Sequence, residues 1–344
     1  MLVRALLRIG VDATAVTAAG KGHARTQRHA VEALARRGGL ELVAFVRDAE
    51  AAALLPVETV VVRERPSIVW EQAGQPARAS GLDAILTWSD RLSVLPQPPT
   101  VIWLFESPVH RIEQNRASGA GEYQRAADWM TSRLWRRSLR RAAHVCFGSE
   151  ATSAEVLGEL PELRGRTSVV YPGLAPGFGP GPASDRGRYA LHLGSTDPRD
   201  NTPAAVEACR QADVELIVVG ELGIGRVSDE ELVELYRGAA AYLDPSLYEG
   251  FGYGVLEAMA CGAPVVASDR TSIPELVGDA GLLCDPESPE ELAAALRRVL
   301  GDPGLAAELR ARGLARAAMF TWERAGDALA AALVRAAGRT PGTA

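Results

Sequence analysis

Short apolar runs alternate with longer amphipathic stretches along most of the chain. Runs bounded by glycine, proline or charged residues predict strands, and stretches with apolar residues every three or four positions predict helices. The first half of this pattern ends in a loop rich in proline and glycine at residues 174–182, a candidate linker between domains. In this half the predicted strands are residues 2–11, 40–46, 59–62, 84–87, 100–104 and 145–148, and a helix is predicted at 26–37.

The pattern restarts after this linker. The predicted strands are residues 189–193, 214–219, 240–243, 264–268 and 281–284, and the predicted helices are 203–211, 229–238, 253–261 and 289–300. Strands that alternate with helices predict parallel sheets covered by helices on both faces. Two such series predict an α/β protein with two Rossmann-like domains. Ligands bind such sheets beyond the carboxyl ends of the strands, so we expect the functional residues on strand-to-helix loops at a cleft between the domains.

Composition narrows the classes of function. The 344 residues carry a net charge of -6, which excludes a general nucleic-acid coat protein. No apolar run reaches the roughly 18 to 20 residues of a membrane span, and the first run, broken by Arg4, Arg8 and Asp12, is interpreted as a strand and not a signal peptide. The 4 cysteines are far apart and form no C-x-x-C motif, as in a reducing compartment. We therefore expect a cytoplasmic protein.

Residues 245–259 carry the strongest chemical signal. Between a predicted strand and a predicted helix lie Gly250, Gly252 and Gly254. Glycines let the backbone approach a ligand, and the free N–H groups of the helix favour an anion such as a diphosphate. Glu249 precedes this helix and Glu257 lies on it, separated by roughly 10 Å at 1.5 Å of rise per residue, so a two-carboxylate hydrolase is disfavoured. The alternative interpretation is a glycine-rich turn beside two surface glutamates.

This segment, with residues 262–267 and 272–276 after it, resembles the retaining nucleotide-sugar glycosyltransferases of family 4, whose signature is Glu-x7-Glu. Residues 8–13, 149–153, 169–173 and 320–323 resemble further parts of that family. The resemblance implies the GT-B fold, in which two Rossmann-like domains face each other across a cleft. It implies an N-terminal acceptor domain over residues 1–172, a C-terminal donor domain over 173–320, and a helix over 321–338 that packs back on the N-terminal domain.

The resemblance also implies roles for individual residues. Glu249 would be the catalytic residue that faces the donor sugar near its reacting carbon, and Glu257 would hold the ribose hydroxyls. Contacts with the acceptor or the sugar are expected for Glu106, His110 and His23. The other residues implied in donor binding are Arg199, Gly250, Phe251, Gly252, Tyr253 and Gly254, with Gly20, Lys21 and Gly22 closing over the donor from the other domain.

The implied reaction moves a sugar from a nucleotide diphosphate to an unidentified acceptor, which is a sugar, a lipid-linked molecule or another small molecule. Retention follows from same-face displacement, in which the leaving phosphate accepts the proton of the acceptor. We expect no cofactor and no metal, because the sequence has no D-x-D motif and no His/Asp cluster suited to a metal ion.

Three departures from the family pattern keep a second hypothesis open. Asp200 stands where the family has a lysine, and Lys21, the one lysine in the chain, could compensate for it. The usual His-Asp pair of the family is missing; Glu106 could replace its aspartate, and no residue is assigned to the contact of its histidine. Residues 220–232 are short by about one helix and one strand. The second hypothesis is therefore a catalytically silent nucleotide-sugar-binding or partner subunit on the same fold.

Weaker signals indicate other classes. The glycines at 220, 223 and 225 follow a strand, but their spacing differs from the G-x-G-x-x-G of a dinucleotide site. A phosphorylase with pyridoxal phosphate is disfavoured, because the second domain has no lysine. One predicted helix carries many arginines, which form either a solvated face or a contact with anionic lipid or a phosphorylated acceptor. Peripheral membrane contact thus stays open. These arginines are Arg133, Arg136, Arg137, Arg140 and Arg141.

Overall fold

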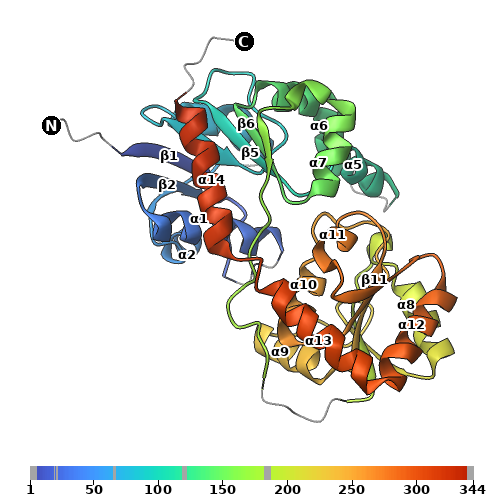
Figure 1. Ribbon diagram of the computed structural model, residues 1–344. Helices are drawn as coiled ribbons and strands as arrows, with labels where there is room; N and C mark the ends of the chain where they lie inside the picture. The colour runs from blue at the N-terminus through green and yellow to red at the C-terminus, as the bar shows by residue number, and fades with distance from the viewer. Residues whose placement is uncertain are drawn as a thin grey trace. The chain divides into compact units, whose positions relative to one another are not determined.

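The structure is a computed structural model, and it describes residues 6–18, 20, 22–64, 67–117, 122–181 and 187–338. The side chains of residues 113–117 and 122–127 are outside this description. The chain forms two compact units (Figure 1). Unit 1 comprises Met1–Gly173 and Trp322–Ala344, and unit 2 comprises Leu174–Thr321.

Unit 1 is built on a parallel sheet. Its described strands form one 7-stranded sheet in the order β3-β2-β1-β4-β5-β6-β7. The central strands are buried along their whole length, which is typical of a sheet covered on both faces. The strands are β1 (Leu7–Asp12), β2 (Leu40–Val46), β3 (Glu58–Val61), β4 (Ala84–Thr87), β5 (Thr100–Leu104), β6 (His144–Phe147) and β7 (Thr167–Val169).

The last helix of the chain belongs to unit 1, where it lies beside the first helix (Figure 1). A Cβ on Gly326 would lie 3.1 Å from the Cβ of Ala33, so a glycine allows this close approach. Leu329 and Leu333 share one buried cluster with Val31 and Leu34. The helices of unit 1 are α1 (His23–Arg37), α2 (Ala49–Ala53), α3 (Ser67–Val69), the π-helical η1 (Trp70–Gly74), α4 (Gln75–Arg78), α5 (Pro108–Ala117), α6 (Glu122–Arg141), α7 (Glu150–Glu159), the 3-10 helix η2 (Pro161–Leu163) and α14 (Trp322–Ala337).

Unit 2 holds a second parallel sheet, 5-stranded and ordered β12-β11-β10-β8-β9 over the described residues. On one side of it α8 and α12 lie together (Figure 1) over a core that includes Leu243, Val266 and Leu296. The strands are β8 (Tyr189–Leu193), β9 (Glu215–Val219), β10 (Ala241–Asp244), β11 (Val265–Ser268) and β12 (Gly281–Cys284). The helices are the 3-10 helix η3 (Pro198–Asp200), α8 (Thr202–Ala212), α9 (Asp229–Gly238), α10 (Tyr253–Cys261), α11 (Ile273–Val277), α12 (Pro289–Gly301) and α13 (Pro303–Ala317).

The predicted α/β class with two parallel sheets is confirmed. Every predicted strand is present within a few residues of its expected bounds; the first begins at Leu7, and residues 1–5 are outside the described part. The sequence pattern missed β7, of 3 residues, and α2, of 5, because so short a segment shows no periodicity. Within the described residues, no helix is long and apolar enough to cross a bilayer.

Candidate functional site

The strand order of unit 2 reverses between β8 and β10. The chain leaves β8 toward β9 on one side, and the later strands β10, β11 and β12 are added on the other. In open α/β sheets this reversal opens a crevice at the carboxyl ends of the two central strands, where ligands bind. The loops at this place are residues 194–201 after β8 and residues 245–252 after β10. Both loops hold residues that the sequence analysis implicates: Arg199 and Asp200 lie on the first, and Glu249, Gly250 and Gly252 on the second.

Two hydrogen bonds join these loops directly. The backbone N–H of Leu247 donates to the carbonyl of Arg199 at 2.8 Å. The amide of Asn201 donates to the carbonyl of Pro245 at 3.0 Å and also to that of Pro286 at 2.8 Å. Asn201 has a left-handed backbone, with φ 51°, which asparagine tolerates better than most residues. The structure therefore brings Arg199 next to the glycine loop, and Asn201 is a residue that sequence reasoning missed.

The turn between β10 and α10 requires glycine at one position, and the first turn of α10 requires it at another. Gly252 has φ 97°, and a Cβ there would lie 2.7 Å from Cδ1 of Ile273. A Cβ on Gly254 would lie 2.3 Å from the hydroxyl of Tyr242. No side chain caps the N-terminus of α10. The first turn of this helix therefore presents backbone and no capping side chain, as an anion site requires.

The backbone of Glu249 is fixed from the neighbouring loop after β11. Its N–H donates to Oγ1 of Thr271 at 3.0 Å, and its carbonyl accepts from the hydroxyl of Ser272 at 2.8 Å. Thr271 has φ 55°, which is strained for a β-branched residue and typical of functional loops. Thr271 and Ser272 hold Glu249, half-buried, at the mouth of the glycine loop. Sequence reasoning assigned no role to either residue.

Glu257 is buried on α10, so it is not the surface glutamate of the alternative interpretation. The hydroxyl of Tyr236, on α9, donates to Oε2 of Glu257 at 3.3 Å. Burial, followed by the charge of Glu257, raises the pKa of Tyr236 well above its ordinary value, so the phenol stays a donor. The ring of Tyr236 packs edge-on against Tyr242, with 5.5 Å between centroids.

The loop after β8 carries two carboxylates. Asp197 forms an ion pair with Arg199 at 2.9 Å, and the Arg199 guanidinium lies 5.8 Å from the ring centroid of Tyr248. Asp200 accepts from the N–H and the hydroxyl of Ser195, at 2.8 and 2.5 Å. Burial raises the pKa of Asp200, and the hydrogen bonds from Ser195 oppose that rise. Asp197 thus partly neutralises the positive charge of Arg199. The hydrogen bonds of Asp200 stay within its own loop, to Ser195.

The predicted residues of unit 1 lie on its first loop and after β5. Lys21 is outside the described residues. Gly22 has φ 54°, and its carbonyl accepts from the N–H of Thr26 at 3.0 Å as α1 begins. His23, the first residue of α1, is exposed, and its ring lies edge-on to Trp88 at 6.2 Å between centroids.

The other three predicted residues of unit 1 are Gly20, Glu106 and His110. Gly20 is closely packed, since a Cβ there would lie 2.5 Å from the Cβ of Ala24. Glu106 is half-buried, two positions beyond β5. His110, on α5, lies 3.6 Å from Glu155 of α7. These positions leave the acceptor contacts of Glu106 and His110 as predictions.

The glycines after β9 make a closed turn. Gly220 and Gly225 form an antiparallel bridge, and α9 begins only at Asp229. Ser228 and Glu231 cap that helix through a reciprocal capping box, so its first N–H groups have partners within the chain. This arrangement lacks the helix that opens directly from a dinucleotide-binding loop.

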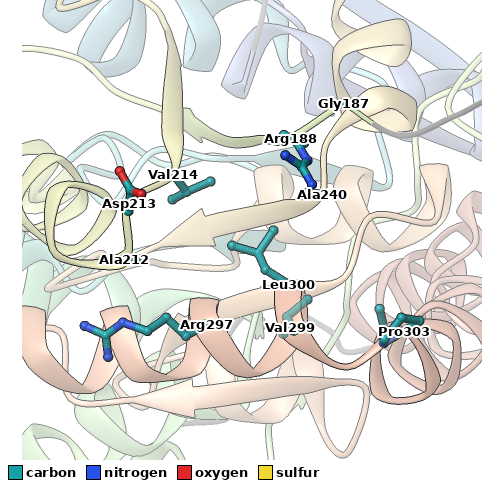
Figure 2. A pocket seen from close by; sticks show the side chains of 12 residues that line it. Gly187, Arg188, Ala212, Asp213, Val214, Ala240, Arg297, Val299, Leu300 and Pro303 are labelled. Carbon is teal, nitrogen blue, oxygen red and sulfur yellow. The ribbon is translucent and has the colours of Figure 1, made fainter.

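A pocket of about 570 Å3 lies at the opposite ends of the same strands (Figure 2). Arg188 and Ala240, at its rim, come just before β8 and β10, and Arg297 and Leu300 come from α12. None of the predicted site residues lines it. Because ligands of parallel sheets bind at the carboxyl ends, this pocket is not the candidate site. Among the described residues, no group of three or more His, Cys, Asp or Glu side chains could hold a metal ion.

Comparison with known proteins agrees with this geometry. Residues 222–316, which include the glycine loop and α10, match the family Glycosyl transferases group 1. The O-antigen chain mannosyltransferase B of Escherichia coli is 38% identical over 162 residues, which are 39% of this chain and 42% of that protein. The chain thus spans less than half the length of curated relatives that it matches in sequence.

Solved structures extend the likeness to nearly all of the chain. Sucrose-phosphate synthase from Thermosynechococcus elongatus has a TM-score of 0.73 at 20% identity, covering 94% of this chain and 98% of that one. HepE from Anabaena, solved with UDP and glucose, has a TM-score of 0.68 at 19% identity, covering 96% and 100%. The chain therefore has the GT-B fold, and residues 222–316 of its unit 2 match the family Glycosyl transferases group 1.

Proposed function

We propose that this chain is a retaining glycosyltransferase that moves a sugar from a nucleotide diphosphate to an acceptor. One observation carries the proposal: Glu249 and Glu257 flank an uncapped helix N-terminus at the point where the strand order of unit 2 reverses. The family match over residues 222–316 and the UDP and glucose held by HepE support a nucleotide sugar as the donor.

The proposed donor lies along the glycine loop. Glu257 accepts the ribose hydroxyls, and the backbone from Gly250 to Gly254 surrounds the diphosphate and the sugar. The helix dipole and the backbone N–H groups of α10 stabilise the negative charge that develops on the leaving diphosphate. Arg199 adds a positive charge, weakened by its ion pair with Asp197.

Glu249 faces the reacting carbon in this proposal, and two hydrogen bonds hold the backbone from which its side chain extends. The acceptor attacks the face that the diphosphate leaves, and the leaving phosphate takes the acceptor's proton. No side-chain base and no metal are needed for this displacement, because fixed backbone donors supply the electrostatic stabilisation. Metal independence is part of the proposal.

The proposal also carries over the roles that the family resemblance implies for residues of unit 1: Gly20, Lys21 and Gly22 contact the donor, and His23, Glu106 and His110 contact the acceptor or the sugar. Replacing Lys21 by Ala weakens donor binding strongly if this lysine compensates for Asp200. Unchanged affinity in Lys21→Ala removes Lys21 from the site.

One observation favours a second candidate, a catalytically silent nucleotide-sugar-binding subunit. Asp197 and Asp200 place two carboxylates on the loop beside the proposed diphosphate, and the one arginine of that loop is paired with Asp197. Two anions near a diphosphate lower its affinity and weaken the stabilisation of a leaving group. A silent subunit binds the donor without ever cleaving it.

The test begins with thermal-shift measurements against UDP, GDP, ADP and dTDP, with and without EDTA. A ligand at a hundredfold excess over its dissociation constant stabilises by about 2.7 kcal/mol. We expect one base to stabilise the wild type in EDTA, and Glu257→Ala to abolish the shift. The matching nucleotide sugar is then incubated without acceptor. Slow hydrolysis supports the transferase, binding without hydrolysis supports the silent subunit, and no shift with any nucleotide contradicts both.

A further inference from the structure

The outer face of α6 combines an exposed aromatic ring with arginines. Trp129 is 58% exposed, and every other exposed large apolar residue among those described is aliphatic or methionine. The guanidinium of Arg133 stacks on its ring, 3.9 Å from the centroid. An indole exposed to this extent costs free energy in water, so a covering partner would stabilise it.

Helical spacing gathers the arginines around this tryptophan. Positions 129, 133, 136, 137 and 140 follow one another at intervals that keep them on one side of an α-helix. The opposite side is buried: Trp135 and Leu139 lie in the core of unit 1 beside Ile102 and Phe147. Helix α6 is thus anchored by one side and presents the other outward, next to α5 and α7 (Figure 1).

Part of the positive charge on this face has no ion-pair partner within the described part of the chain. Arg136 pairs with Glu159 and Arg140 with Glu162, each at 2.6 Å. Arg133 and Arg137 have no carboxylate within ion-pair distance among the described residues. Both lie on the surface of a chain whose net charge is -6, so the positive charge is a local property of this face.

Two exposed aliphatic side chains lie near the C-terminal end of α6, beside Arg141. Val94 and Leu95, in the loop after β4, are 51% and 47% exposed. The loop is tied to α6, because the N–H of Leu92 donates to Oγ of Ser138 at 2.9 Å and Arg141 donates to the carbonyl of Ser93 at 2.7 Å. The surface formed by Trp129, Arg133, Arg137, Arg141, Val94 and Leu95 is called the α6 face below.

We propose that the α6 face docks on the surface of an anionic lipid bilayer. Arginines attract anionic headgroups, a tryptophan ring prefers the boundary between headgroups and acyl chains, and exposed aliphatic side chains enter the apolar layer. A free phosphate or a nucleic acid satisfies the arginines but gives Val94 and Leu95 no apolar surroundings. The full set of side chains therefore selects a lipid surface, and this inference does not rest on the proposed donor chemistry.

The test is co-sedimentation of the full chain with vesicles. We expect binding to phosphatidylcholine vesicles that contain phosphatidylglycerol, little binding to pure phosphatidylcholine, and loss of binding at high salt. Reversing two charges, in Arg133→Glu with Arg137→Glu, reduces the partition coefficient by about tenfold or more. The matched control, Arg210→Glu with Arg226→Glu, makes the same change of net charge on highly exposed residues of unit 2 and binds like the wild type.

Fluorescence locates the contact. The emission of Trp129 is obtained as the difference between the spectra of the wild type and of Trp129→Phe. We expect binding to vesicles to shift this emission to shorter wavelength. We also expect Trp129→Ala to weaken binding. Circular dichroism verifies that each variant is folded. Equal binding to neutral and anionic vesicles, equal loss in the control pair, an unshifted Trp129 spectrum, or binding to an RNA oligonucleotide but not to vesicles would overturn the proposal.

Discussion

The hydroxyl of Tyr236 donates a hydrogen bond to the buried carboxylate of Glu257, across 3.3 Å from one helix of unit 2 to the next. The two residues are 21 positions apart in the sequence. Packing of Tyr236 against Tyr242 and Phe178 fixes its ring, so the phenol orients the carboxylate that we propose for ribose binding. Tyr236 is therefore a positioning residue for Glu257.

Replacing Tyr236 by Phe should weaken nucleotide affinity while leaving the chemical step nearly intact. A hydrogen bond to a charged group is worth about 1.5–3 kcal/mol, so the dissociation constant should rise roughly tenfold or more. Titration calorimetry measures the affinity, and initial rates give kcat. A fall in kcat with unchanged KM would contradict the assignment, because a positioning residue for the ribose acts on binding.

Replacing Glu249 by Gln should produce the opposite pattern. The variant keeps the clamped backbone and the side-chain shape but loses the charge beside the reacting carbon. We expect kcat to fall by about 10²–10³, the size seen when one group that stabilises a transition state is removed. Affinity for the nucleoside diphosphate alone should stay the same. Glu230→Gln, an exposed carboxylate on α9, is the matched control and should leave kcat unchanged.

Replacing Gly254 by Ala should destabilise unit 2, because Gly254 packs closely against Tyr242. In Gly254→Ala the new methyl group would meet the Tyr242 hydroxyl at 2.3 Å, although alanine is the better helix former. Overpacking of this kind costs about 1–3 kcal/mol, or roughly 2–4 °C of Tm for each kcal/mol in a domain of this size. In Gly301→Ala nothing lies within 4 Å of the added methyl, so that variant should keep or raise Tm. Equal Tm in both variants would show that the surrounding structure shifts to make room for the added methyl group.

The charge of Asp200 should oppose the diphosphate. Asp200→Asn keeps an oxygen that accepts from Ser195 and removes the negative charge. We expect nucleoside diphosphates to bind about threefold to tenfold more tightly at low salt, with the gain shrinking as salt screens the interaction. Asp213→Asn, at the other end of the sheet, is the control with no expected effect. Weaker binding in Asp200→Asn would mean that Asp200 serves the ligand.

His192 should make stability depend on pH. Its ring is buried, donates to the carbonyl of Leu243 and accepts from Thr202, both at 3.0 Å, and burial lowers its pKa. Below about pH 6.5 the histidine is protonated in the unfolded chain but stays neutral in the folded chain. The free energy of unfolding therefore falls as pH falls, by up to about 1.4 kcal/mol per pH unit.

Denaturant unfolding of wild type and His192→Gln at several pH values tests this dependence. The variant should be less stable near neutral pH, because it loses two fitted hydrogen bonds. The difference between the two proteins should shrink as the solution is acidified. A constant difference across the series would show that His192 does not contribute to the acid sensitivity.

The sequence was sufficient for the fold class because its signals are local. Apolar runs such as Leu40–Val46 and Thr100–Leu104 are contiguous, and helical spacing at Asp229–Gly238 spans few turns. The break of the pattern at residues 174–182 likewise lies in neighbouring residues. Elements such as β7 and α11 are stabilised by tertiary packing more than by their own pattern, and local periodicity did not reveal them.

The residues of the candidate site likewise fall into two groups, those that local spacing revealed and those that only the fold brings together. Glu249, the glycines and Glu257 lie within nine consecutive positions, so spacing alone marked them. The partners that hold them are distant: Thr271 is 22 positions from Glu249, and Pro245 is 44 from Asn201. A sequence without its fold gives no sign that these residues meet.

By itself, therefore, the sequence determined the order of the elements, two parallel sheets and the loop with the Glu-x7-Glu spacing, because each depends on neighbouring residues. The tertiary structure decided the strand order of unit 2, which brings the loops after β8 and β10 together. It also decided that Asp200 bonds to Ser195 and that Trp129 lies on the surface. Such contacts follow from how strands order themselves and from which side of a helix is buried, and these depend on packing across the whole unit.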